Sequence, residues 1–119
     1  MERVQFIRHK DKEILFLDFS ECKAEEVVLI IDKAKSVIAR QPEKSLLTLS
    51  NVTNARFDDT VSQRMKEFTA HNKPFVKAAA VVGVTGLKKI VFEAVMLFSK
   101  RKIHAFATIE QAKDWLAAQ

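Results

Sequence analysis

The sequence predicts an α/β fold: a single domain whose five-stranded mixed sheet is covered by about four helices. Segments of strand periodicity alternate with segments of helical periodicity, in the order β-β-α-β-α-β-α-β-α. The length of 119 residues suits one domain, so residues 1–119 are expected to fold as one unit. Because a parallel strand return needs a crossover that a helix supplies, the alternation favours largely parallel pairing.

An antiparallel hairpin followed by a helix is predicted at the start of the chain. The strands at 4–8 and 13–18 flank a polar turn, and the second strand contains an uninterrupted apolar run, typical of a strand covered on both faces. Apolar residues then recur at helical spacing from 27 to 38. Ser20 or Glu21 is expected to cap this helix, and Gln41-Pro42 to end it, because proline disfavours helical geometry in the residue before it.

The remaining elements follow from apolar periodicity and from the residues that interrupt it. Their predicted places are a strand at 46–49, a helix that begins at Asp58 or Asp59 and is broken at 72–74, a strand at 75–82, a helix at 87–99, a strand at 103–107 and a last helix capped by Thr108. The inward positions of the second helix are Val61, Met65 and Phe68, and those of the last helix are Ala112, Trp115 and Leu116.

Composition and charge limit the cellular environments and the classes of partner that suit this chain. No apolar run reaches the ~18–20 residues of a membrane span, no long apolar leader begins the sequence, and the single cysteine, Cys22, suits a reducing, bacterial-type cytoplasm. Residues 1–59 contain 10 basic and 11 acidic side chains and residues 60–119 contain 10 and 4, so the net charge of +5 comes from the second half. A cationic surface attracts phosphates, acidic proteins or anionic membranes. Nucleic acid is not favoured, because residues 100–102 are the only run of three cations.

Both glycines of the chain, Gly83 and Gly86, lie in the predicted junction between the fourth strand and the third helix. Ligands of open α/β sheets meet the loops at the carboxyl ends of parallel strands, so the loops 51–59 and 83–86 form the candidate functional surface. Gly83, Thr85, Gly86 and Lys88 are either an anion-binding loop, with free N–H groups at the helix start, or a tight turn that packs closely. Elsewhere, left-handed backbone is expected most readily at Asn51, Asn54 or Asn72.

The third helix carries apolar side chains around most of its circumference. The face with the most apolar positions is predicted to lie inward, and it comprises Leu87, Ile90, Val91, Ala94, Leu97 and Phe98. Phe92, Val95 and Met96 then fall beside the polar face. They are interpreted either as a self-association surface that makes a homodimer or as the contact with a neighbouring helix.

The inventory of catalytic groups predicts no enzyme, metal site or cofactor. His9, His71 and His104 are far apart in the sequence, and neither a metal-binding spacing nor a nucleophile motif occurs. Asp58-Asp59 is interpreted as a helix cap rather than a catalytic carboxylate pair. Cys22 is expected to be structural, because neighbouring glutamates oppose its thiolate.

Three segments carry a family resemblance. Leu-Leu-Thr-Leu-Ser-Asn-Val-Thr at 46–53, Val-Val-Gly-Val-Thr-Gly-Leu at 81–87 and Glu-Gln-Ala-Lys-Asp-Trp-Leu at 110–116, together with the element order, resemble the SpoIIAA-like proteins of the STAS/SEC14-like superfamily. The resemblance covers nearly the whole chain. It implies a compact mixed sheet with helices around it, in a group of small intracellular proteins that are mostly uncharacterised.

The better-known relatives implied by this resemblance are anti-sigma-factor antagonists, which bind proteins and are switched by phosphorylation of a serine after the third strand. The corresponding stretch here, 54–60, contains neither serine nor glycine. Thr53 or Thr60 would be a loose substitute, but a phosphate beside Asp58 and Asp59 would meet like charge. The phosphorylation switch is therefore not carried over.

Together these observations predict a non-enzymatic STAS-like module that binds a protein partner. The expected partner-binding residues are Asn54, Arg56, Asp58, Asp59 and Thr60, next to the glycine loop. The alternative function, implied by the SEC14-like kinship and the basic second half, is a carrier or sensor of a small apolar or anionic ligand. It would hold an acyl chain beneath the third helix or an anionic group at 83–86.

Overall fold

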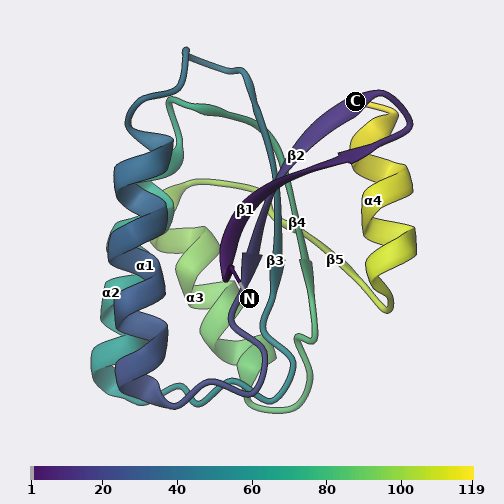
Figure 1. The fold of residues 1–119 in the computed structure, drawn as a ribbon. Coiled ribbons are helices and arrows are strands. Elements are labelled where there is room, and N and C mark those ends of the chain that lie inside the picture. Colours follow the sequence, from purple (N-terminus) through teal and green to yellow (C-terminus); the bar gives the residue numbers. More distant parts are fainter. Residues whose placement is uncertain (1) are drawn as a thin grey trace.

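The computed structural model describes residues 2–119 and contains the five strands and four helices in the predicted order (Figure 1). The strands are β1 (Val4–His9), β2 (Lys12–Asp18), β3 (Leu46–Asn51), β4 (Val76–Val82) and β5 (His104–Phe106). The helices are α1 (Ala24–Ile38), α2 (Asp59–Asn72), α3 (Lys88–Ser99) and α4 (Ile109–Ala117). Within residues 2–119, no helix combines the length and the apolar character needed to cross a membrane.

The sheet is mixed, with the spatial order β1-β2-β3-β4-β5. β1 pairs antiparallel with β2, and the other three pairings are parallel. The carboxyl ends of β2 to β5 therefore meet at one edge of the sheet, the lower edge in Figure 1, and the loops 51–59 and 83–86 leave from it. The topology thus brings the two predicted functional loops to the same end of the molecule.

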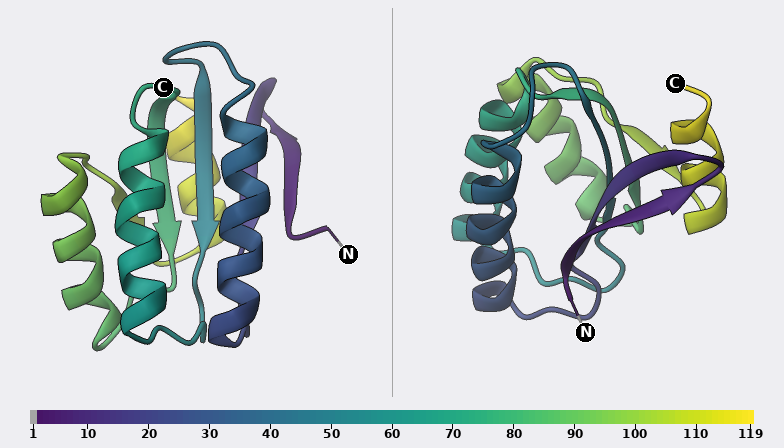
Figure 2. Two further views of the ribbon diagram at one scale, coloured as in Figure 1. Left: turned by 90° about the vertical axis from the view of Figure 1, so that its left-hand side faces the viewer. Right: turned by 45° about the horizontal axis from the view of Figure 1, so that its top comes forward.

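Helices cover both faces of the sheet unequally. α1, α2 and α3 stand in a row on one face and α4 covers the other, with α3 at the outer end of the row (Figure 2). Consecutive residues of β3 point to opposite faces: Leu46 belongs to the core under the three helices, whereas Leu47 and Leu49 belong to the core under α4. Two covered faces explain why β2 and β3 are so continuously apolar.

The caps of α2 and α4 are confirmed, and that of α1 differs from the prediction. Asp58 accepts a hydrogen bond from the N–H of Val61 at 2.8 Å, and Thr108 accepts one from the N–H of Gln111 at 3.2 Å. α1 begins later than predicted, after Lys23. Ser20 is occupied in donating its hydroxyl proton to Asp18, and Glu21 has left-handed backbone at φ 59°, so an additional turn precedes the helix.

Left-handed backbone is found at Asn54 among the three predicted asparagines. Asn51 ends β3 and Asn72 is a buried residue of α2, so the regular hydrogen bonding of those elements fixes their backbone. Lys10 and Asp11, which were not predicted, are left-handed because the hairpin turn has two residues between the paired His9 and Lys12.

The predicted orientation of α3 is wrong. Phe92 and Val95 are 6% and 0% exposed and Met96 is half-buried, so these residues are not an exposed self-association surface. Four of the six residues predicted to lie inward are instead at the surface, with Leu87 81%, Ile90 65%, Leu97 80% and Phe98 54% exposed, whereas Val91 packs against the core and Ala94 is half-buried. The alternative of a neighbouring helix fits the structure: α3 packs against α2, and the Phe92 ring contacts Phe57 with the centroids 6.0 Å apart.

Candidate functional site

The two loops at the lower edge are in contact, as the sequence predicts. A methyl group added at Gly83 would come within 2.5 Å of the backbone nitrogen and the hydroxyl of Thr53. The N–H of Val52 donates to the carbonyl of Val82 at 2.9 Å, which extends the pairing of β3 with β4 into the loops. Gly83 is therefore required by close approach, and its φ of 92° also favours glycine.

An open pocket at this corner gathers positive charge. Lys23, Arg56 and Lys88 line it together with Glu21 and Asn54. The carboxylate of Glu21 accepts a hydrogen bond from the Asn54 amide at 2.7 Å. The pocket therefore contains three cationic side chains and one carboxylate, which is already hydrogen-bonded. We call Lys23, Arg56 and Lys88 the cationic corner, and their excess of positive charge suits an acidic partner.

Lys23 is the corner residue that the sequence analysis missed. It follows the end of β2, whose carboxyl end meets the same edge as those of β3 and β4. Its position just after a parallel strand could have identified Lys23, because such loops lie at the edge of the sheet where ligands bind.

The other predicted partner-binding residues lie next to a second pocket. Asp58 and Thr60 line an open pocket between α1 and α2 with Val28 and Leu29, whereas Arg56 faces the cationic corner. The Asp58 carboxylate caps α2, and Asp59 is exposed at the first position of the helix. The five predicted residues therefore share one edge but not one pocket.

The glycine loop has the geometry of a packed turn. The N–H groups of Lys88, Lys89 and Ile90 donate to the carbonyls of Thr85, Gly86 and Leu87 at 3.1–3.2 Å. In an anion-binding loop, these first N–H groups of the helix would be free to donate to the anion. Their internal bonds favour the tight-turn interpretation.

The exposed side of α3 forms a continuous apolar surface, which we call the α3 stripe. It consists of Leu87, Ile90, Ala94, Leu97 and Phe98, of which Ala94 is half-buried. Lysines border both ends of the stripe, at 88 and 89 and at 100 and 102, and none of the four forms an ion pair within residues 2–119. The single acidic residue of α3 is Glu93. The stripe is a contiguous exposed apolar patch with a basic rim.

One solved structure with a similar architecture extends over nearly the whole chain. It is the crystal structure of an uncharacterised DUF3478 family protein with a SpoIIAA-like fold from Shewanella loihica PV-4. It superposes with a TM-score of 0.72 and 16% sequence identity, over 95% of this chain and 91% of that one. This chain has a SpoIIAA-like fold. The chain matches no protein-family model, and no curated protein matches it.

On this SpoIIAA-like fold the three histidines stay apart and have structural surroundings. His9 Nε2 lies 2.7 Å from a carboxylate oxygen of Asp114, and the Lys10 ammonium lies 3.1 Å from the same oxygen. Glu110 also lies nearby, so that possible metal-ligand atoms of His9, Asp114 and Glu110 lie within 4.8 Å of one another. Because the Lys10 ammonium already neutralises Asp114, an ion pair accounts for the arrangement. The ring of His104 packs against Trp115 with the centroids 4.3 Å apart.

Cys22 is 1% exposed, and its burial raises the pKa of the thiol. A raised pKa lowers the thiolate fraction at neutral pH. We therefore expect iodoacetamide at pH 8 to alkylate Cys22 in the folded protein at least about tenfold more slowly than in urea. Mass spectrometry of timed samples measures both rates. Equal rates would contradict a buried, inert thiol.

Proposed function

We propose that this protein is a non-enzymatic interaction module that binds a protein partner through the α3 stripe and the adjoining cationic corner. The observation that carries the proposal is the stripe itself. Four large apolar side chains, each more than half exposed, lie along one helix that has no neighbour on its outer side within residues 2–119 (Figure 2). Single exposed apolar residues are ordinary, but a contiguous set of this size is typical of a binding surface.

The spacing of the stripe indicates how it binds. Leu87, Ile90, Ala94 and Leu97 occupy positions i, i+3, i+7 and i+10, which are the anchor positions of a helix that lies in an apolar groove. α3 would thus act as the ridge and the partner would supply the groove. The lysines at both ends of the stripe select a groove with carboxylates around its rim, since complementary charge speeds association and rejects other partners.

The corner extends this surface at the amino-terminal end of α3. Arg56 and Lys88 line the same pocket, and Leu87 immediately precedes Lys88 in the chain. Asn54, Asp58, Asp59 and Thr60 lie on the same edge and would form part of the polar rim of the interface. A second copy of this chain is a poorer fit than an acidic partner, because a symmetric contact through α3 would place the lysines of one copy against those of the other.

The test compares capture by the wild-type protein with capture by the double variant Leu87→Glu/Leu97→Glu. Phe6→Glu is the control, because Phe6 is an apolar side chain 39% exposed on β1, at the edge of the sheet opposite β5. We expect recovery of the partner from a native lysate to fall at least about tenfold with the stripe variant, and to be unchanged with the control. A photo-crosslinking residue at position 90 should attach to an acid-rimmed groove of the captured protein.

Other occupants of the stripe give different results in the same experiments. A wild-type dimer in sedimentation velocity that the stripe variant converts to monomer would assign the surface to a second copy. Co-sedimentation with anionic vesicles that the stripe variant loses would assign it to a membrane. Either result, or equal recovery of every partner by wild type and stripe variant, would overturn the proposal.

A further inference from the structure

A small, partly open cavity lies between the sheet and α2, and five polar residues contribute to its lining. Its volume is about 30 Å³. On a comparable measure a water molecule needs about 10–15 Å³, so the cavity has room for a few atoms and none for an acyl chain. The polar residues that line it are Thr48, Ser50, Thr69, Asn72 and Arg101. Thr48, Thr69 and Asn72 are buried, each 4–6% exposed.

The polar side chains around the cavity converge from two elements. Residues of β3 alternate between faces, and Leu46, two residues before Thr48, belongs to the core under α1 to α3, so Thr48 and Ser50 point toward α2. Thr69 belongs to the buried face of α2. The hydroxyls of these three residues make no hydrogen bond to any group of residues 2–119. These hydroxyls are therefore available to bond with a polar guest in the cavity that they line.

Arg101 brings a positive charge to the same cavity. One of its guanidinium nitrogens donates to the backbone carbonyl of Thr69 at 3.2 Å. Among residues 2–119 no carboxylate pairs with it. Burial lowers the pKa of Arg101 to about 10, which still leaves the group charged at neutral pH. The guanidinium is half-buried and also borders an open pocket with Lys100 and Lys102, so its remaining N–H groups are available to an anion that enters the cavity.

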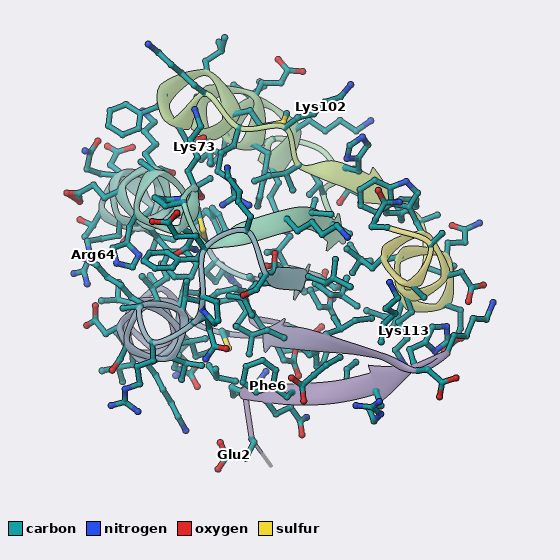
Figure 3. All side chains as sticks on the ribbon, turned by 90° about the horizontal axis from the view of Figure 1, so that it is seen from above. Glu2, Phe6, Arg64, Lys73, Lys102 and Lys113 are labelled. Carbon is teal, nitrogen blue, oxygen red and sulfur yellow. The ribbon has the colours of Figure 1, made fainter. Side chains whose placement is uncertain are left out.

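The volume of the cavity and the planar shape of the Arg101 guanidinium favour a small carboxylate over other anions. A guanidinium binds planar carboxylates through two parallel hydrogen bonds, and the hydroxyls that line the same cavity can donate to carboxylate oxygens. Tetrahedral dianions such as sulfate are larger and carry more charge than one guanidinium neutralises. Lysines 73, 100 and 102 are exposed at the end of the molecule where α2 and α3 finish, with Lys73 and Lys102 labelled in Figure 3, and they would attract an anion to this end.

We propose that the cavity between β3, α2 and Arg101 is a binding site for a small monocarboxylate of the size of formate or acetate. The carboxylate would pair with the Arg101 guanidinium and accept hydrogen bonds from Thr48 and Thr69. The cavity shares no lining residue with the α3 stripe or the corner, although Arg101 also borders an open pocket beside Leu97, and the site stands or falls independently of the interaction function. Because such a ligand has few atoms, its Kd is expected in the millimolar range.

The test is a titration of the ¹⁵N-labelled protein with sodium formate, sodium acetate and, in a parallel arm at matched ionic strength, sodium sulfate. The readouts are the Arg101 side-chain Nε–H signal and the backbone amides of Thr48 and Thr69. We expect saturable shifts with formate and acetate, and none with sulfate. Arg101→Met should weaken the binding of formate at least about tenfold. Lys35→Met is the control: it removes an exposed charge from α1, which contributes no residue to the cavity, and it should leave the Kd unchanged.

Three results would overturn the site. They are the absence of saturable shifts with formate and acetate, equal shifts with sulfate, and the same Kd for formate in Arg101→Met as in wild type. If far-ultraviolet circular dichroism shows that Arg101→Met is unfolded, the wild-type comparison of formate with sulfate decides, supported by Thr69→Val. That substitution nearly preserves the side-chain volume. We expect it to weaken the binding of formate several-fold, because one hydrogen-bond donor is lost.

Discussion

Replacing Val95 with aspartate should destabilise the protein severely, by about 4 kcal/mol or more. Val95 is 0% exposed and lies in the core under α1 to α3, where an ionised carboxylate would have no partner and no water. Urea unfolding followed by circular dichroism measures the change. A variant that does not fold at all agrees with the prediction.

Leu97→Asp is the matched comparison on the same helix. Leu97 is 80% exposed, so we expect the free energy of unfolding to change by no more than about 1 kcal/mol, most of it from the lower helix propensity of aspartate. The pair separates the two possible orientations of α3. A larger loss of stability in Leu97→Asp than in Val95→Asp would contradict the structure. It would mean that the side of α3 carrying Leu97 packs against the core.

Substituting alanine for Gly83 is expected to cost about 3 kcal/mol or more of the free energy of unfolding. The added methyl group would lie 2.5 Å from the nitrogen and 2.7 Å from the Cα of Thr53, and backbone atoms cannot turn aside as a flexible side chain can. The backbone at φ 92° also disfavours any side chain. The loops 51–59 and 83–86 would have to separate, so the cationic corner should lose its shape as well.

Gly86→Ala controls for the loss of backbone freedom at a glycine. Gly86 also has positive φ, at 58°, but nothing lies within 4 Å of an added methyl group. Its substitution should cost only about 1 kcal/mol. Equal costs at the two positions in urea unfolding would show that the contact between the loops contributes little to stability.

The order of elements and the sheet were predictable because their signals are local. The alternation of periodicities fixed the five strands and four helices, and the helix requirement of parallel returns fixed most of the pairing. The contact between the glycine loop and the 51–59 loop was predictable for the same reason, since parallel strands end at one edge. Asp58 and Thr108 were identifiable as caps because short polar side chains satisfy the first N–H groups of a helix.

The start of α1 could not be predicted, because it depends on contacts made outside the helix. Asp18, at the end of β2, accepts hydrogen bonds from both the N–H and the hydroxyl of Ser20, at 3.0 and 2.6 Å. The N–H of Glu21 donates to the carbonyl of Thr53 at 2.9 Å, a partner 32 positions further along the chain. No local pattern reports such a partner.

The sequence by itself determined an α/β chain in which the loops 51–59 and 83–86 share one edge of the sheet. Only the tertiary structure decided which side of α3 faces water. The helix is apolar around most of its circumference, so its periodicity suits either orientation. Packing against α2 buries Phe92 and Val95 and leaves Leu87 and Leu97 outside. The cavity at Arg101 was hidden for the same reason: residues from β3, α2 and the segment after α3 meet there only once the helices are docked.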